Sequence, residues 1–275
     1  MKSASIVIIT YNRPYSALLL AKKIRRFDNN IEIIIVDQAK TSKITKRERK
    51  LLKINYVNLE EPSVSIARNK GIEKAHGEIV IFLDDDVEIT KRTIHEHIKA
   101  YSNPKIICVT GRVINDDDKF PKNIKVETGK TNFLGTKFSL NFWSTQNQYV
   151  DFPYGCNMSF RKNILIEIGM FDKKYDKYFE EVDLGARLKK KHYLIKFEPK
   201  ALVYHHQAKV GGARSSNPHG IFYDHYGYYL AKNVPFPFSL ISLFIRTITV
   251  LKQYPKVIVN LYSGYFNYFI NILNR

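Results

Sequence analysis

Three shortages in this sequence limit what kind of protein it is. Only two of its 275 residues are cysteines, Cys108 and Cys156, which argues against a disulfide framework and favours a reduced compartment. The longest mostly apolar stretch, Phe236 to Leu251, is interrupted by Arg246 and is shorter than the ~20 residues of a membrane-spanning helix. A signal peptide is not evident either, because Met1-Lys2-Ser3 leads directly into strand-like sequence.

Acidic residues are also scarce. The chain has 26 Asp and Glu against 44 Lys and Arg, which gives a formal net charge of +18. Such a charge implies an anionic partner, which is a nucleic acid, an acidic membrane surface or a phosphorylated substrate. We find no zinc-ligand spacing, helix-turn-helix signature or RNP-type aromatic motif, so charge is the only support for nucleic-acid binding.

What the sequence does contain is a regular α/β pattern in its first half. A hydrophobic content of 44% argues against disorder and allows a large folded domain. We predict strands at 5–10, 31–36, 54–58, 79–83 and 106–114, alternating with helices at 14–27, 43–52, 63–75 and 91–101. Short connections between such elements are typical of a doubly wound, mainly parallel sheet flanked by helices. Thr10, Asp37 and Asp84 end three strands, so we expect the ligand site at that edge.

The second half of the chain is less regular. Between residues 115 and 149 no pattern dominates, and after it we predict a turn and strand at 155–161, a helix at 179–191, two short strands at 193–197 and 201–204, and a loop at 211–217. From residue 226 the sequence is rich in Tyr, Phe, Leu and Ile with interspersed Lys and Arg. This composition predicts an amphipathic helical region at a membrane interface, or alternatively a helical cap packed on the domain.

The strand at 79–83 ends in Asp84-Asp85-Asp86. Asp84 and Asp86 point the same way if the chain stays extended, and their oxygens would suit Mg²⁺ or Mn²⁺ and, through the metal, a diphosphate. The alternative is a solvated acidic turn. A second triple, Asp116 to Asp118, also follows an apolar segment, so this stretch by itself leaves both interpretations open.

Several segments in a fixed order resemble the family 2 glycosyltransferases of the GT-A fold. They extend from Ser5 to about Gly212 and read IVIITYNR (6–13), VD (36–37), ARNKG (67–71), FLDDD (82–86), GCNMSFR (155–161), and FEEVDL (179–184) with Arg187. The resemblance implies a Rossmann-like GT-A domain over residues 1–225, with a nucleotide-sugar half at 1–114 and an acceptor half at 115–225. Residues 226–275 would be a helical, membrane-associating extension, which is a variable region in such proteins.

The resemblance also implies a donor and metal site. It assigns the metal ligands to Asp86 and Asp84, and it leaves Asp116 to Asp118 as a surface turn. His205 is the expected third ligand, and its imidazole favours Mn²⁺ over Mg²⁺, although a lone histidine is more often structural. The donor is a nucleotide-diphospho-sugar, with a UDP-sugar expected, and its predicted binding residues are Thr10, Tyr11, Asn12, Arg13, Asp37, Arg68, Asp84 and Asp85. For Arg68 the alternative is an ordinary helix-surface charge.

By the same resemblance, Glu181 is the catalytic base. The family commonly has Asp at this position, so Glu adds one methylene of reach and leaves Glu180 and Asp183 as alternatives. Carboxylates in a first helical turn also complement the helix dipole without any catalytic role. Asp183 and Arg187 are four residues apart and would then simply pair on the helix surface.

The acceptor side is expected to contain Gly155, Cys156, Asn157, Glu180 and Trp143, with core packing as the alternative for Trp143. Asp151 lies in the same irregular stretch. The glycines of the loop at 211–217, which includes Arg214, predict a lid over the donor phosphates.

Together these features predict an inverting, metal-dependent glycosyltransferase. We expect it to be cytoplasmic and peripheral on the inner face of the cell membrane, and to build a bacterial-type surface polysaccharide on a saccharide or lipid-linked saccharide acceptor. An anionic membrane surface is an expected partner, and nucleic acid is not. The alternatives are a basic nucleic-acid-binding protein and an inactive GT-A scaffold subunit.

Overall fold

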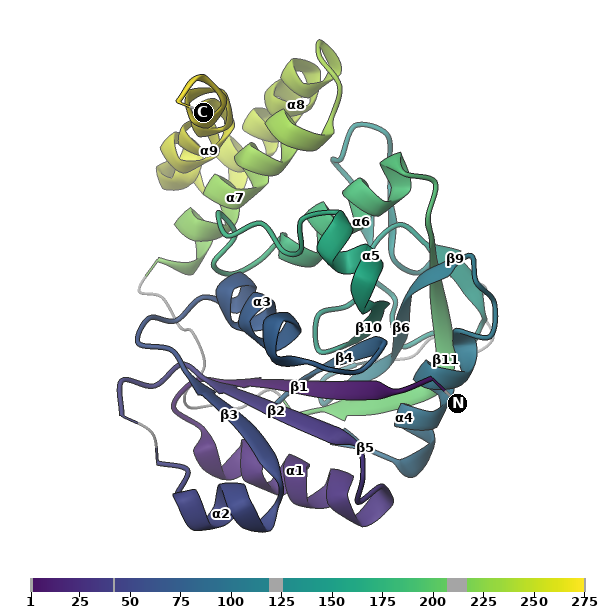
Figure 1. The fold of residues 1–275 in the computed structure, drawn as a ribbon. Coiled ribbons are helices and arrows are strands. Elements are labelled where there is room, and N and C mark those ends of the chain that lie inside the picture. Colours follow the sequence, from purple (N-terminus) through teal and green to yellow (C-terminus); the bar gives the residue numbers. More distant parts are fainter. Residues whose placement is uncertain (1, 42, 119–125, 207–216, 275) are drawn as a thin grey trace.

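A mixed nine-stranded sheet with helices on both faces forms the centre of the molecule (Figure 1). The computed structural model describes residues 2–41, 43–118, 126–206 and 217–274. The strand order is β3-β2-β1-β4-β10-β6-β11-β5, with β9 paired to β11. These strands are β1 (Ala4–Thr10), β2 (Glu32–Asp37), β3 (Ile54–Asn58), β4 (Ile79–Asp84), β5 (Val87–Ile89), β6 (Ile106–Asn115), β9 (Gln148–Val150), β10 (Asn157–Arg161) and β11 (Leu194–His205). A separate hairpin pairs β7 (Lys130–Thr131) with β8 (Phe138–Ser139).

The helices follow the predicted positions closely in the first half of the chain. They are α1 (Pro14–Phe27), α2 (Lys46–Leu51), α3 (Val64–Lys74), α4 (Lys91–Ala100), α5 (Lys162–Glu167), α6 (Glu180–Lys190), α7 (Pro218–Asn233), α8 (Phe238–Gln253) and α9 (Ile258–Leu273), with a short 3₁₀ helix η1 (Pro255–Val257). Their starts have ordinary local causes. Pro14 occupies the first turn of α1, and Thr45 and Glu48 form a reciprocal capping box at α2.

The first four strands of the sheet are parallel, as predicted. β3, β2, β1 and β4 pair side by side, and Ile6, Val7 and Ile8 of β1 are completely buried. A strand covered by helices on both faces needs an uninterrupted apolar run, and β1 and β4 have one. The register places Thr10 opposite Asp37 and Ile9 opposite Asp84. The three polar strand ends therefore lie next to one another at one edge.

One feature of the sheet refines the predicted mainly parallel arrangement, and a second feature differs from the prediction. β10 is antiparallel to both of its neighbours, β4 and β6, so the sheet is mixed. The two short strands predicted at 193–197 and 201–204 are one strand, β11, whose register against β6 shifts between Glu198 and Val203. Pro199 lies in this interval and has no backbone N–H to donate, so the ladder is irregular there, but the strand continues.

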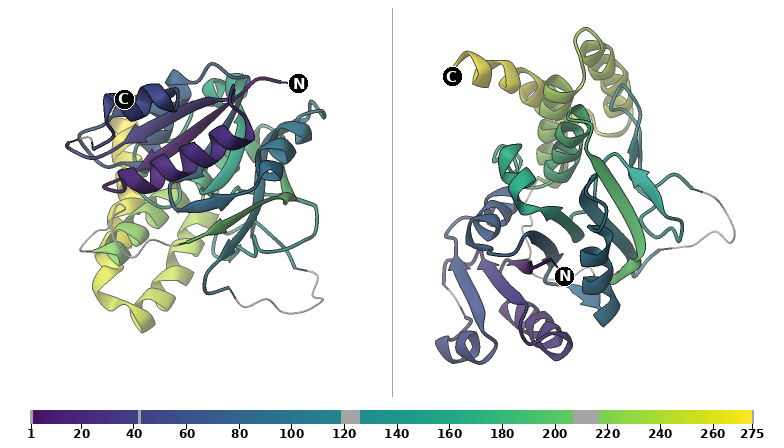
Figure 2. Two further views of the ribbon diagram at one scale, coloured as in Figure 1. Left: turned by 90° about the horizontal axis from the view of Figure 1, so that it is seen from below. Right: turned by 45° about the vertical axis from the view of Figure 1, so that its right-hand side comes forward.

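The C-terminal helices α7, α8 and α9 gather on one side of the domain, away from β2 and β3, and the further views agree (Figure 2). α7 and α9 approach closely at two glycines, since a Cβ at Gly227 would lie 2.0 Å from the Leu261 carbonyl and one at Gly264 would lie 1.7 Å from the Asp224 carbonyl. α7 extends across residues 225 and 226, so the predicted domain boundary falls within a helix and stays a prediction. Among the described residues, no helix is long and apolar enough to cross a membrane.

Candidate active site

A cavity of about 720 Å³ opens at the ends of β1 and β4. This volume lies in the range of small-molecule sites. Residues from widely separated segments line it, and they include these predicted site residues: Thr10, Tyr11, Arg13, Arg68, Asp84, Asp86, Gly155, Cys156, Glu180, Glu181 and His205. The strand-end edge predicted from the sequence therefore does carry a cavity.

Asp84, Asp86 and His205 form an acidic cluster with one histidine. One ligand atom from each residue lies within 4.8 Å of the others. His205 Nε2 is 3.3 Å from Asp86 Oδ1, and its Nδ1 is 3.0 Å from Asn115 Oδ1, which orients the ring. Burial raises the pKa of Asp84, and the carboxylate of Asp86 adds to the rise while Arg68 opposes it. Two carboxylates and an imidazole at this spacing are a suitable ligand set for Mn²⁺ or Mg²⁺.

Asp85 has a different position from its two neighbours. Its side chain is fully buried, where its Oδ2 accepts hydrogen bonds from Thr10 Oγ1 at 2.5 Å and from Arg13 Nε at 3.1 Å. Burial raises the pKa of Asp85 to about 7, against the opposing effect of Arg13. Asp85 does not line the cavity, so its predicted contact with the donor stays a prediction without support from its position. It instead fixes the loop that begins at Thr10.

Arg13 bridges this loop to the acidic strand end. Its guanidinium contacts Asp85 Oδ1 at 2.5 Å and Asp86 Oδ2 at 2.7 Å. Burial lowers the pKa of Arg13, but Asp85 and Asp86 outweigh this effect and the pKa is raised. The cation therefore stays charged and partly neutralises the cluster. Asn12, next to it, is exposed with φ of 58° and does not line the cavity.

Arg68 of α3 is 3% exposed, so it is not an ordinary surface charge. Its Nη1 is 2.5 Å from Glu180 Oε1, and its Nη2 donates to the Gly155 carbonyl at 3.2 Å. A Cβ at Gly155 would lie 2.7 Å from Arg68 Nη2, so a larger residue at this position would displace the guanidinium. Arg68 Nη2 also lies 3.9 Å from Asp84 Oδ1. One buried cation thus connects the acidic cluster with the start of α6.

Glu180 and Glu181 open α6 after two strained residues. Tyr178 and Phe179 have φ of 64° and 67°, a left-handed conformation that costs about 1–3 kcal/mol for such residues and occurs often at functional sites. The Phe179 ring is held by stacking on Tyr226, with centroids 5.2 Å apart. This turn directs the first residues of the helix to the cavity, which both carboxylates line.

The surroundings of Glu181 suit a general base. Burial raises the pKa of Glu181 well above its ordinary value, and the adjacent Glu180 raises it further, while Arg68 acts in the opposite direction. A carboxylate with a raised pKa has more affinity for a proton than an exposed one. Glu180 differs because it forms the ion pair with Arg68.

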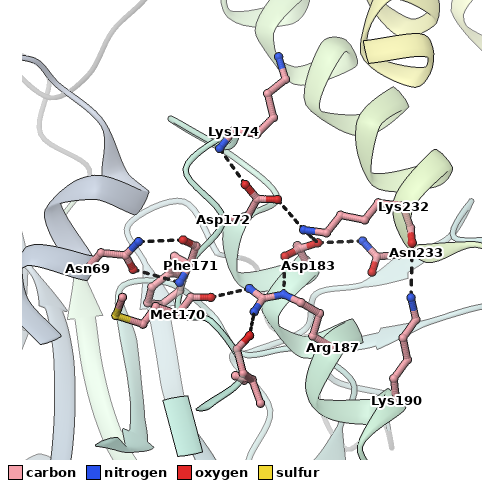
Figure 3. A network of polar contacts seen from close by, with 11 residues as sticks. Asn69, Met170, Phe171, Asp172, Lys174, Asp183, Arg187, Lys190, Lys232 and Asn233 are labelled. Atoms are coloured by element: carbon pink, nitrogen blue, oxygen red, sulfur yellow. Dashed lines mark hydrogen bonds and ion pairs between the residues drawn. The ribbon is translucent and has the colours of Figure 1, made fainter. Parts of the chain in front are cut away.

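Asp183 belongs to a separate polar network (Figure 3). It is fully buried and contacts Arg187 Nε at 2.8 Å, Lys232 Nζ at 2.8 Å and Asn233 Nδ2 at 2.9 Å. The predicted Asp183–Arg187 pair is therefore present, but it lies inside the protein and not on the helix surface. Asp183 does not line the cavity, so its position argues against it as the base. The network instead joins α6 to the end of α7.

Three other predicted residues also lie outside the cavity lining. Asn157 is fully buried, with its amide nitrogen bonded to the carbonyls of Arg112 and Ala201 and its oxygen 2.8 Å from His97. Asp37 is 1% exposed and accepts from Tyr56 Oη at 2.9 Å.

Trp143, the third of these residues, is half-buried. Most of the expected lid, including Arg214, lies outside the described residues. The Asp151 carboxylate pairs with Lys189 at 3.0 Å and does not line the cavity.

The apolar wall of the cavity was not among the features predicted from the sequence. Besides the predicted residues, the cavity is lined by Phe138, Leu140, Phe152, Tyr154, Tyr178, Phe179, Phe222, Gln38 and Lys177, among others. Tyr178 and Phe179 directly precede Glu180, so their position in the sequence could have predicted that they line the cavity. Phe138 and Phe222 come from distant segments of no regular pattern, and only the fold brings them together. The cavity thus has a charged part at the strand ends and an aromatic part.

Asp116 to Asp118 form a surface turn, as the resemblance implied. Asp118 Oδ2 accepts from the Asn115 amide at 2.8 Å, and the exposed Asp116 lies 2.8 Å from His206 Nδ1. None of the three lines the cavity.

Comparison with known proteins agrees with these features. Glycosyl transferase family 2 matches residues 5–169. Two relatives from Bacillus subtilis (strain 168) are named as uncharacterized glycosyltransferases. YwdF is 29% identical over 216 residues, which cover 78% of this chain and 77% of YwdF. YfnE is 24% identical over 238 residues, and the match spans 67% of this chain but only 60% of YfnE.

A third relative is the Mycobacterium tuberculosis N-acetylglucosaminyl-diphospho-decaprenol L-rhamnosyltransferase, which is 28% identical over 148 residues and matched over 48% of each chain. Among solved structures, GalNAc-T7 with UDP, GalNAc and Mn²⁺ aligns with a TM-score of 0.63 at 17% identity, over 93% of this chain and 58% of that one. The mannosyltransferase PcManGT from Pyrobaculum calidifontis, with GDP-Man and Mn²⁺, aligns with a TM-score of 0.56 at 13% identity, over 98% of this chain and 88% of that one. At these identities the two structures show a shared fold.

Proposed function

Because this chain belongs to glycosyl transferase family 2, we propose that it transfers a sugar from a nucleotide-diphosphate donor to an acceptor hydroxyl with inversion at the anomeric carbon. The observation that carries the proposal is one cavity lined by the Asp84–Asp86–His205 cluster and by Glu181. These groups meet the two chemical needs of the reaction, which are neutralising the leaving diphosphate and removing a proton from the acceptor.

The donor end is the charged part of the cavity. Asp84, Asp86 and His205 would hold Mn²⁺ or Mg²⁺, and the bound cation would stabilise the charge of the departing diphosphate as a Lewis acid. Thr10 and Tyr11 would contact the nucleotide from the loop after β1, which Asp85 and Arg13 hold in place. GalNAc-T7 and PcManGT carry UDP and GDP-Man in their structures, which supports a nucleotide donor here, and we expect a UDP-sugar.

Glu181 is the proposed base. Its carboxylate faces the cavity, its pKa is raised by burial, and its Oε2 has no hydrogen-bond partner among the described residues. A partly unsatisfied carboxylate can accept the proton of the acceptor hydroxyl as that oxygen attacks the anomeric carbon. Arg68 holds Glu180 in an ion pair, so that Glu181 is the carboxylate left for proton transfer.

The aromatic part of the cavity is the proposed acceptor side. Phe138, Tyr154 and Phe222 give it the flat apolar surface on which sugar rings commonly pack, and Gly155 and Cys156 complete the wall. The mycobacterial relative is named for a decaprenol-linked acceptor, which supports a lipid-linked saccharide for this chain. We therefore propose action at the inner face of the cell membrane, in the synthesis of a bacterial-type surface glycan.

The test is donor turnover with a panel of UDP-, GDP- and dTDP-sugars, with and without Mn²⁺. Glu181→Gln keeps the size of the side chain but removes its basicity, so it should lower transfer by about 10²–10⁴-fold. Glu167→Gln, on the exposed side of α5, is the matched control and should transfer at the wild-type rate. Unchanged transfer by Glu181→Gln would remove Glu181 as the base. Failure to bind any donor, together with salt-sensitive binding of duplex DNA, would favour a nucleic-acid-binding protein.

A further inference from the structure

Helix α8 buries two serines beside Leu243 and Val250 and turns most of its large apolar side chains outward. Ser239 and Ser242 are 2% and 0% exposed, whereas Phe244 is 65% exposed. The exposed apolar residues recur mainly every three or four positions and share one side of the helix, which we call the outer face of α8: Phe238, Leu240, Ile241, Phe244, Ile245, Ile248 and Leu251. A surface helix in water normally shows the opposite pattern, with its apolar stripe toward the core.

Specific contacts of its inward side hold α8 in this orientation. Ser239 Oγ is 2.9 Å from Tyr265 Oη, and Arg246 donates to Tyr226 Oη at 3.0 Å and to the Thr136 carbonyl at 2.7 Å. Turning the apolar side inward would break these hydrogen bonds and leave buried partners unsatisfied. The outward position of the apolar side chains is therefore a built feature of the fold, which leaves each of them at least 40% exposed.

The charged residues near the outer face of α8 indicate which kind of surface binds it. Residues 225–275 contain no Asp or Glu, and Lys252 and Lys256 are exposed at the end of α8. Cations beside an apolar helix face complement a surface that is both apolar and anionic. A second copy of the chain fits less well, since each copy carries a formal charge of +18. The 16 residues of α8 are too few to span a bilayer, so the helix would lie along its surface.

We propose that the outer face of α8 is a docking surface that inserts into a bilayer containing anionic lipid. This inference rests on the proposed function, because a lipid-linked acceptor would be encountered at the same bilayer. It identifies the side chains that make the contact and distinguishes them from the catalytic cavity.

The hairpin formed by β7 and β8 connects the docking surface to the cavity. Its Phe133 packs edge-on against Phe238 of the outer face, with ring centroids 5.0 Å apart, and Arg246 holds its Thr136 carbonyl. Its Phe138 lines the cavity, and the ring lies 5.9 Å from Phe179, which precedes the carboxylates of α6. One short element thus contacts both the proposed bilayer surface and the aromatic wall. Docking would therefore bring that wall to a membrane-borne acceptor.

Vesicle co-sedimentation of the full chain tests the proposal. The vesicles are phosphatidylcholine alone, or phosphatidylcholine and phosphatidylglycerol in equal parts. Phe244→Glu with Ile248→Glu should lower partitioning into the mixed vesicles by at least about tenfold, because two apolar groups are replaced by anions. Leu51→Glu is the matched control, since Leu51 is 74% exposed on α2, and it should bind as the wild type does. Lys252→Gln with Lys256→Gln should weaken binding to the mixed vesicles and reduce its salt dependence.

The outcomes separate docking from catalysis. Hydrolysis of the donor without acceptor is measured in parallel and should be equal in the wild type and the Phe244→Glu, Ile248→Glu protein. Vesicle binding that depends on the outer face, in a chain that hydrolyses no donor, supports docking and counts against the proposed function only. Equal vesicle binding by all variants overturns the docking surface. A wild-type dimer that the double variant abolishes, without vesicle binding, overturns it in favour of a second copy.

Discussion

Two segments of this chain read Asp-Asp-Asp after an apolar strand, and their surroundings are opposite. Asp84 to Asp86 are enclosed by Arg13, Arg68 and His205 at the end of a central strand. Asp116 to Asp118 lie on a turn after β6, where His206 is the neighbour of Asp116. The same three letters form a candidate metal site in one place and a solvated turn in the other. The difference is the set of cations and the cavity that the fold brings to each triple.

The loss of a proposed metal ligand gives the largest expected contrast between the two triples. Asp86→Ala should lower the rate of sugar transfer by about 10²–10³-fold, because a ligand of the proposed metal and a partner of Arg13 are lost together. Asp117→Ala, in the exposed triple, should change the rate less than about twofold, as is usual for a surface substitution. Both rates are measured by release of the nucleoside diphosphate. Similar losses in the two variants would break the comparison.

The middle residues should differ in stability. Asp85→Ala removes the buried acceptor of Thr10 and Arg13, so it should lower the free energy of unfolding by about 1–3 kcal/mol. Asp117→Ala should stay within about 0.5 kcal/mol of the wild type. Urea unfolding in EDTA gives both values.

The pH dependence of stability sharpens this contrast. The pKa of Asp85 is raised to about 7 in the folded protein, whereas an unfolded Asp has a pKa of about 3.9. Between about pH 4 and 7, Asp85 is therefore protonated in the folded state and deprotonated in the unfolded state. The contribution of Asp85 to stability should be full below about pH 4 and decline as the pH rises to 7. A wild-type pH profile parallel to that of Asp85→Ala would contradict this assignment.

Each triple has its own histidine, which allows a smaller and matched test. His205 lies 3.3 Å from Asp86, and His206 lies 2.8 Å from Asp116. His205→Gln should weaken Mn²⁺ binding by about tenfold because an imidazole ligand is lost, and it should affect Mg²⁺ less. His206→Gln should leave both affinities unchanged. Isothermal titration with each metal alone provides the measurement, and equal Mn²⁺ affinities in both variants would remove His205 from the site.

Neighbouring charges distinguish the two triples, and they should also set the pKa of Glu181. Glu180 raises the pKa of Glu181 by repulsion, so Glu180→Gln should lower that pKa. Because the base must be deprotonated, transfer rises with pH through this pKa, and the rise should move to lower pH in the variant. The profile of kcat against pH shows the shift. A rise that stays in place, or moves to higher pH, would mean that another group titrates.

Much of the donor side was predictable because strands and their ends leave local signals. The apolar runs of β1 and β4 are uninterrupted since both faces are buried, and the polar residues after them mark the edge of the sheet. Arg68 was predicted to lie near the donor because its motif resembles the family; the structure puts its guanidinium 3.9 Å from Asp84, and the donor contact stays a prediction. The acceptor side was less predictable, since Phe138, Phe179 and Phe222 meet through an irregular region and two residues with positive φ.

Asp84 to Asp86 show which features of the site the sequence predicts and which it does not. The sequence by itself determined the strand, the acid at its end and the family whose motifs surround it. Only the tertiary structure decided that Asp84 and Asp86 line the cavity while Asp85 is buried, because the chain turns at Asp85 and Asp86 and because Thr10 and Arg13, from a distant segment, bond to Asp85. The outward apolar face of α8 was decided in the same way, since hydrogen bonds to residues distant in sequence hold Ser239 and Arg246 inward.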